Sequence, residues 1–168
     1  MTAISRISLT VPFCVSLLLA MMAAPSANAE ALRYKSAKAS EVLLTPRWAF
    51  DGDGLSAEQL NTLVAELKAA ELRFDVSRHI KSRVHIYLAM PTLVKGLRGT
   101  SGLRVEWLAR GQFQAGSVSP GTRALVFAGL VTSAELVGQF DFTLTIDARS
   151  LQGPLGFDPA FEIEVIGK

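Results

Sequence analysis

Cysteine is nearly absent from the sequence, and histidine is scarce. Cys14 is the only cysteine among 168 residues, and His79 and His85 are the only histidines. One cysteine excludes an internal disulfide, Cys-based zinc sites and CxxC redox chemistry. The two histidines are six residues apart, which does not fit the i, i+4 spacing of a helical metal pair. We therefore predict no metal and no cofactor, and a fold that depends on an ordinary hydrophobic core.

Long hydrophobic runs are missing after the first 29 residues. Within that stretch, Arg6 precedes an apolar run over Val11–Ala24, and the stretch ends in Ala27-Asn28-Ala29. A positive start, a short apolar middle and an Ala-x-Ala end are typical of a secretory signal peptide. The run is shorter than the about 20 apolar residues that span a bilayer. We expect cleavage after Ala29, no transmembrane segment in the mature chain, and a periplasmic or secreted bacterial protein.

Recognisable catalytic and nucleotide-binding motifs are also missing. The sequence has no Walker loop, no GxGxxG fingerprint and no Gly-x-Ser-x-Gly elbow, to which Gly99-Thr100-Ser101-Gly102 comes nearest. Asp51-Gly52-Asp53-Gly54 resembles part of a calcium loop, but Ala49 and Leu60 occupy the outer ligand positions. We therefore interpret it as a tight turn. A small hydrolase that uses His79 or His85 stays open as an alternative, because the members of a triad need not be adjacent in sequence.

The net charge is only +2, but its distribution is uneven. Residues 73–110 hold eight Lys or Arg and two acids, whereas residues 111–168 hold three cations and six acids. Arg suits bidentate contact with phosphate, sulfate or carboxylate. The basic segment thus either binds an anionic polysaccharide or lipid, or pairs with acidic strands across a sheet. The candidate anion-binding residues are Arg78, Lys81, Arg83, His85, Tyr87, Arg98 and Arg104.

Nucleic acid is not expected as a partner. Tyr87 is the lone aromatic residue among these cations, whereas proteins that bind single strands place several aromatics between theirs. Six other aromatic residues lie at apolar positions of alternating segments, so we predict that they pack in the core. They are Trp48, Phe74, Trp107, Phe140, Phe142 and Phe161.

Alternation of apolar and polar residues dominates the chain after residue 41. Such alternation indicates strands with one buried and one wet face, as in antiparallel sheets. Pro46 cannot donate to a sheet ladder, so the first strand is expected at an edge or a bulge. Residues 30–40 are expected to form a flexible lead-in to a single domain over 41–168. The predicted strands cover residues 42–50, 72–76, 83–90, 103–107, 123–127, 140–147 and 161–165.

One segment has helical spacing. Ser56 and Gln59 match a capping box, and Leu60, Leu63, Val64 and Leu67 fall on one helical face. This spacing predicts a helix over residues 57–70. The predicted fold is a mainly β, antiparallel β-sandwich of immunoglobulin-like or fibronectin-like build with one α-helix. The alternative is an α+β fold in which that helix packs on one antiparallel sheet.

These observations favour a binding protein over an enzyme. We expect an exported, non-enzymatic interaction module of the bacterial cell envelope that binds a protein partner, because strand-rich folds offer edges to which a partner strand can add. Two alternatives remain: binding of an anionic envelope polymer or lipid through the Arg-rich surface, and a small periplasmic hydrolase.

Overall fold

The structure is a computed structural model that describes residues 29–36, 42–43 and 45–167. The expected signal peptide lies outside the described residues, except for Ala29. Within the described ranges the chain is mainly β, with twelve strands, three short 3-10 turns and no α-helix. None of these segments forms a helix long and apolar enough to cross a bilayer.

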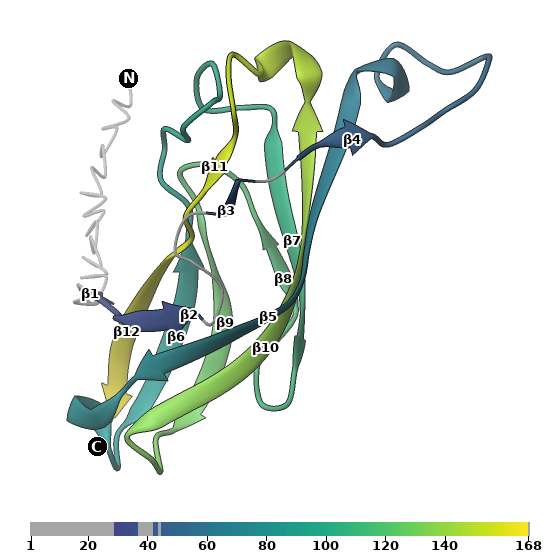
Figure 1. Ribbon diagram of the computed structural model, residues 1–168. Helices are drawn as coiled ribbons and strands as arrows, with labels where there is room; N and C mark the ends of the chain where they lie inside the picture. Colours follow the sequence, from purple (N-terminus) through teal and green to yellow (C-terminus); the bar gives the residue numbers. More distant parts are fainter. Residues whose placement is uncertain (1–28, 37–41, 44, 168) are drawn as a thin grey trace, which may run out of the picture.

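Two antiparallel sheets make up most of the fold (Figure 1). The four-stranded sheet has the order β1 (Glu30–Ala31), β12 (Ala160–Gly167), β6 (Arg83–Ala89) and β9 (Arg123–Leu130). Its strands pair in the antiparallel sense throughout. The strands predicted over residues 83–90, 123–127 and 161–165 are therefore confirmed.

The six-stranded sheet centres on two long strands, β5 (Thr62–Asp75) and β10 (Glu135–Asp147). The other strands are β7 (Leu103–Arg110) and β8 (Gly116–Val118) beyond β10, and β2 (Tyr34–Ser36) and β4 (Arg47–Trp48) on the free side of β5. A third, two-stranded sheet joins β3 (Val42–Leu43) to β11 (Gly156–Phe157). The 3-10 turns are η1 (Gln59–Asn61), η2 (Ser77–His79) and η3 (Ala148–Ser150).

Aromatic side chains from both large sheets meet in one buried cluster. The rings of Phe74 on β5 and Phe161 on β12 are 4.9 Å apart edge to face, and Phe113 lies 5.7 Å from Phe127 on β9. Such tilted and edge-to-face arrangements are the favoured geometry for aromatic pairs. Five of the six aromatics predicted for the core are buried, namely Phe74, Trp107, Phe140, Phe142 and Phe161.

The predicted helix over residues 57–70 is wrong. The predicted capping contacts do form, since the Ser56 N–H donates to Gln59 Oε1 at 2.9 Å and the Gln59 N–H donates to Ser56 Oγ at 3.3 Å. They cap only the single turn of η1, after which the chain enters β5. The α+β alternative is therefore also wrong, because it required this helix.

The apolar residues that indicated a helix do not share one environment. Leu63 and Leu67 lie on one face of β5 and pack against the core, Val64 lies on the other face, and Leu60 is 56% exposed in η1. After Leu67, β5 also has a bulge: Phe140 on β10 pairs with Ala70, but Phe142 pairs with Leu67, so β5 has one extra residue at this point. The extra residue shifts the side chains that follow to the other parity.

Two further segments differ from the prediction. Instead of one strand over residues 42–50, β3 and β4 pair with different sheets. Pro46 precedes β4, which pairs with β5 at the edge of the six-stranded sheet, in agreement with the expected edge position. The segment expected to be a flexible lead-in contains β1 and β2, which pair with β12 and β5.

Candidate interaction surfaces

The seven predicted anion-binding residues do not gather at one place. Arg78, Lys81 and Arg83 lie in and after η2, at the end of the molecule where β6 begins. His85 and Tyr87 continue along β6, and Arg104 lies on β7 in the other large sheet. Arg98 lies in the connection between β6 and β7, at the opposite end from Arg83. No single ligand can contact all seven.

Many of the basic residues pair with acidic residues of the same sheet. Arg104 Nε lies 3.2 Å from Glu106 Oε1, and its Nη2 donates to Ser117 Oγ at 3.0 Å. Arg73 reaches Glu135 on the adjacent β10 at 3.4 Å. Only the contact between Arg73 and Glu135 joins neighbouring strands, which is the cross-strand pairing expected as the alternative to a binding face, since Arg104 and Glu106 lie on the same strand β7. Exposed pairs of this kind contribute only about 0–1 kcal/mol each.

His85 and Tyr87 belong to a polar cluster on one face of the four-stranded sheet. Arg123 Nη1 donates to Glu164 Oε1 at 2.6 Å and to Glu162 Oε2 at 3.2 Å, and its guanidinium carbon is 4.4 Å from the Tyr87 ring centroid. The Tyr87 hydroxyl contacts His85 Nδ1 at 3.3 Å. Burial raises the pKa of Tyr87, and the nearby Glu164 raises it further. The Arg123 cation is thus already neutralised within the protein.

Three cations and several apolar side chains remain together at the end where β6 begins. Residues 77–83 contain Arg78, Lys81 and Arg83 and no acid. Within the described part of the chain, Lys81 and Arg83 have no ion pair, and Arg78 lies 3.8 Å from Glu30 with its side chain 82% exposed. We call this surface, residues 77–83 with the exposed side chains of Leu130, Val165 and Ile166, the basic end.

The backbone holds the basic end together. The Lys81 N–H donates to the Val131 carbonyl at 2.8 Å, and the Val131 N–H donates to the Ser82 carbonyl at 2.9 Å. Arg83 pairs in register with Leu130 on β9 and with Gly167 on β12. The cations and the exposed apolar side chains therefore lie together around the last rungs of the sheet, with Leu130 on the face of Arg83 and Val165 on the face of Val84.

The cavities near the basic end have mixed charge. One, of about 380 Å³, is lined by Arg33, Arg78 and His79 but also by the carboxylates of Glu30 and Asp75. A second, of about 740 Å³, brings Arg33, Lys35 and Arg73 together with Asp75 and Glu135. Neither collects cations alone, as a phosphate or sulfate pocket does.

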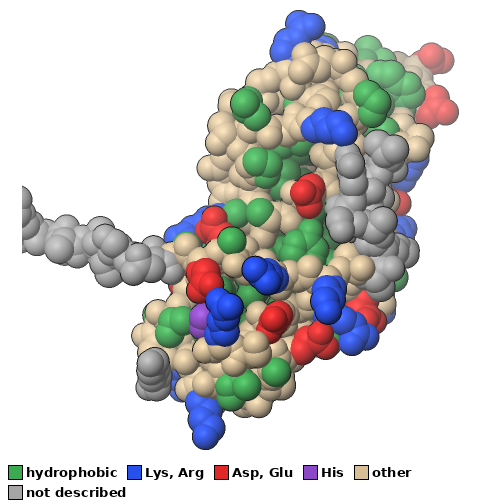
Figure 2. All heavy atoms as spheres, turned by 60° about the vertical axis from the view of Figure 1, so that its left-hand side comes forward, with side chains coloured by type: hydrophobic (Ala, Val, Ile, Leu, Met, Phe, Trp, Pro, Cys, Tyr) green, Lys and Arg blue, Asp and Glu red, His purple; other side chains and the backbone are tan. Residues whose placement is uncertain are grey.

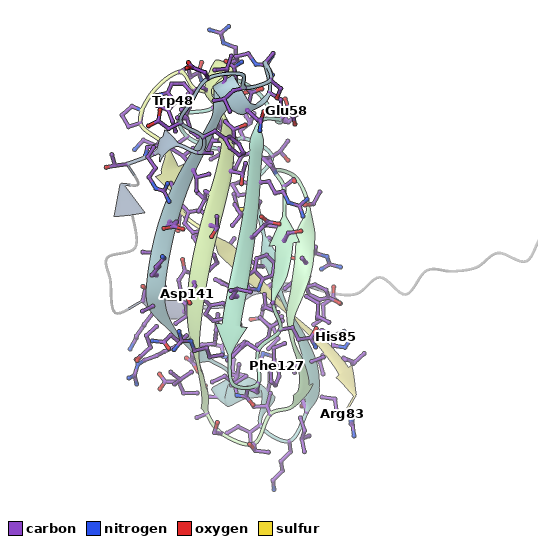
Figure 3. The ribbon with its side chains drawn as sticks, turned by 90° about the vertical axis from the view of Figure 1, so that its right-hand side faces the viewer. Trp48, Glu58, Arg83, His85, Phe127 and Asp141 are labelled. Atoms are coloured by element: carbon purple, nitrogen blue, oxygen red, sulfur yellow. The ribbon has the colours of Figure 1, made fainter. Side chains whose placement is uncertain are left out.

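The opposite end carries a projecting segment that the sequence reasoning missed. Residues 46–61, which we call the arm, comprise β4, the turn around Asp51–Gly54 and η1. In Figure 1 the arm extends away from the two large sheets. Trp48, Phe50 and Leu60 are exposed by 57%, 45% and 56%. Figure 2 shows hydrophobic and acidic side chains together at its upper right, and Figure 3 places Trp48 and Glu58 at this same end.

The exposure of these three side chains was not expected, because each occupies a position that is typical of a buried residue. Trp48 and Phe50 share the parity of a strand that was expected to pack on the core, and Leu60 was part of the apolar face of the predicted helix. Because β4 is only two residues long and η1 is a single turn, neither element covers these side chains. Pro46 and the Asp51–Gly54 turn were the signals of an edge segment that leaves the sheet.

The described residues hold no group of three or more His, Cys, Asp or Glu side chains that could bind a metal ion. Searches for related proteins returned no matching protein-family model, no matching curated protein and no matching solved structure.

Proposed function

We propose that the protein is an exported, non-enzymatic interaction module of the cell envelope, which binds a protein partner through the arm. The observation that carries this proposal is the exposure of Trp48, Phe50 and Leu60 on a segment that projects from the fold. Apolar side chains that gather on one exposed surface mark interaction sites more often than single ones do. Aromatic side chains are also enriched among the residues that dominate protein interfaces.

The rest of the chain supports this proposal because it can serve as a scaffold for the arm. We propose that the two large sheets form an immunoglobulin-like or fibronectin-like sandwich, as the rings of Phe74 and Phe161 that meet between them support. A rigid scaffold that presents a loop at one end is a common arrangement in binding proteins. Export is supported by the composition of residues 1–29.

The two alternatives have weaker support. An anionic polymer or lipid is favoured only by Arg78, Lys81 and Arg83, because Arg98 and Arg104 lie elsewhere. If replacing these three with Ala leaves binding to anionic vesicles and its salt dependence unchanged, that alternative fails. A hydrolase lacks support near His85, whose ring nitrogen contacts the Tyr87 hydroxyl.

Affinity capture with matched variants tests the main proposal. The double variant W48S/F50S removes the aromatic side chains of the arm, whereas L93S/L108S removes two leucines that are 73% and 68% exposed elsewhere. The unaltered protein should capture its partner from envelope extract. The amount captured should fall about tenfold or more with W48S/F50S and should stay the same with L93S/L108S. Equal recovery with both variants would overturn the proposal. Thermal unfolding of each variant confirms that it is folded.

A further inference from the structure

We propose that the protein partner of the arm is the basic end of a second copy of the same chain, so that molecules associate head to tail. This inference rests on the proposed function and names its partner. The composition of the arm, the composition of the basic end, and the position of these two surfaces at opposite ends of one molecule support head-to-tail association.

The arm combines apolar side chains with negative charge that is only partly compensated, since Glu58 interacts electrostatically with Arg149. Besides Trp48, Phe50 and Leu60, it carries the exposed acids Asp51, Asp53 and Glu58. In the described part of the chain none of these three acids has an ion pair. The one cation of the arm, Arg47, lies 3.8 Å from Glu66 on β5 and is thus directed to its own sheet.

The basic end has the complementary composition. It combines Arg78, Lys81 and Arg83 with exposed apolar side chains, of which Ile80, Leu130, Val165 and Ile166 are 44%, 51%, 48% and 57% exposed. Arg78 is partly neutralised by Glu30 and Asp75, whereas Lys81 and Arg83 have no ion pair among the described residues. Asp75 accepts hydrogen bonds from the hydroxyl and backbone N–H of Ser77, at 2.7 and 3.1 Å, and Glu135 contacts Arg73.

These two surfaces match in the way that interfaces do. Protein interfaces have an apolar centre and a polar rim, and complementary charge on the rim selects the partner. The arm offers the acids Asp51 and Asp53 together with three large apolar side chains, and the basic end offers the cations Lys81 and Arg83 together with four. A second copy of the chain fits as the partner, because the chain itself carries both of these complementary surfaces.

One molecule cannot make this contact with itself. The strand β5 begins directly after η1 in the arm and ends two residues before η2 at the basic end. Its 14 residues span about 45 Å in extended conformation. Figure 3 accordingly shows Trp48 and Glu58 at one end of the sheets and Arg83 at the other. The contact is therefore between molecules and uses different surfaces on each, which generates rings or open chains rather than closed two-fold dimers.

Charge exchange between the two surfaces tests the proposal. One variant, D51K/D53K, makes the arm basic, and the other, K81E/R83E, makes the basic end acidic. In sedimentation velocity at low salt, the unaltered protein should associate as its concentration rises, and added salt should weaken this association. Each variant alone should associate about tenfold or more weakly, because like charges meet. An equal mixture should regain association, since every contact then joins opposite charges.

A third variant, R98E, controls for net charge. Arg98 lies at the same end as the arm, so R98E changes the net charge as R83E does but leaves the basic end intact. It should associate like the unaltered protein. The proposal is overturned if the unaltered protein stays monomeric up to about 100 μM at low salt, a concentration at which even weak specific contacts form. It is also overturned if the mixture of exchanged variants stays monomeric. If self-association is absent while W48S/F50S still loses an envelope partner, this inference fails and the proposed function stands.

Discussion

The carboxylate of Asp141 on β10 accepts a hydrogen bond from the backbone N–H of Ala69 on β5, at 2.7 Å. Ala69 is the site of the bulge and has a φ of 53°, in the left-handed region that disfavours residues with a Cβ. The side chain of Asp141 thus satisfies a backbone donor that the extra residue withdraws from the ladder. One carboxylate thereby stabilises the point at which β5 changes parity.

Removing this carboxylate should destabilise the fold. We expect D141A to lower the free energy of unfolding by about 1–2 kcal/mol, because the Ala69 N–H loses its partner. Asp141 also lies 3.7 Å from Arg110, whose side chain is 72% exposed. The control R110A removes only that ion pair and should cost at most about 0.5 kcal/mol. Denaturant unfolding measures both, and equal losses would show that the hydrogen bond to Ala69 contributes nothing.

Glycine at position 69, in the bulge, should stabilise the protein, whereas glycine at position 70 should destabilise it. At Ala69 the positive φ favours glycine, so A69G should raise the free energy of unfolding by about 0.5 kcal/mol. The adjacent Ala70 is only 2% exposed and lies outside the left-handed region, so A70G should lower the free energy of unfolding by about 1 kcal/mol. Thermal unfolding compares them directly. If A69G is as destabilising as A70G, the backbone conformation assigned to the bulge is wrong.

The space around Gly138 on β10 should not admit even one methyl group. A Cβ at this position would lie 2.7 Å from ring carbons of both Phe113 and Phe140. Both rings are buried in the core, so G138A should cost about 1–3 kcal/mol through overpacking. At Gly153, where nothing lies within 4 Å, the same change should have an effect within about 0.5 kcal/mol. Equal unfolding midpoints for G138A and G153A would contradict the packing between the sheets.

Tyrosine ionisation gives a pH test of the same region. Burial, and then the Asp158 carboxylate, raise the pKa of Tyr34 to about 12. Because the folded pKa lies above the unfolded value of about 10, the contribution of Tyr34 to stability is complete below pH 10 and is lost as the pH rises toward 12. Y34F should remove this loss, and D158N should move the phenolate titration, followed by absorbance, toward lower pH. An unshifted titration near pH 10 would contradict the burial of Tyr34.

The sequence predicted the regular strands well because alternation is a local property. Val84, Ile86 and Leu88 on β6 are all buried, as their parity required. The strand β5 was not predictable, since Leu60, Leu63, Val64 and Leu67 have the apolar spacing of a helix although they lie in η1 and on both faces of β5. Only pairing with β10, more than 60 residues later in the chain, identifies Thr62–Asp75 as a strand.

The candidate surfaces were only partly predictable for the same reason. The stretch with Arg78, Lys81 and Arg83 forms a local cluster, which the sequence shows directly. The pairing of Arg73 with Glu135, or of Arg123 with Glu164, depends on which strands lie near one another, and charge counts do not contain that information. The exposure of Trp48 depends on where β4 ends. A side chain at an apolar position of an alternating strand is buried only if another part of the fold packs over it.

The two tryptophans should report these environments separately. Trp107 is 2% exposed and its Nε1–H donates to the Gln114 carbonyl at 2.8 Å, whereas Trp48 is 57% exposed. In dilute protein, the W107F variant should show red-shifted emission that acrylamide quenches readily, and W48F should show blue-shifted, protected emission. The reverse order, or two equally protected tryptophans, would place Trp48 in the core and remove the basis of the proposed binding surface.

Photocrosslinking from the arm tests the proposed function most directly. A photoreactive amino acid at position 48, in the protein expressed from its full sequence, should form adducts with a protein partner in intact cells. The same group at the exposed position 93, on a surface with no proposed role, should form few or none. Adducts at position 48 that map to residues 77–83 of a second copy are the result that head-to-tail association predicts. Adducts to another protein would place the arm on a different partner, and the absence of protein adducts at position 48 would contradict the account of the arm as a binding surface.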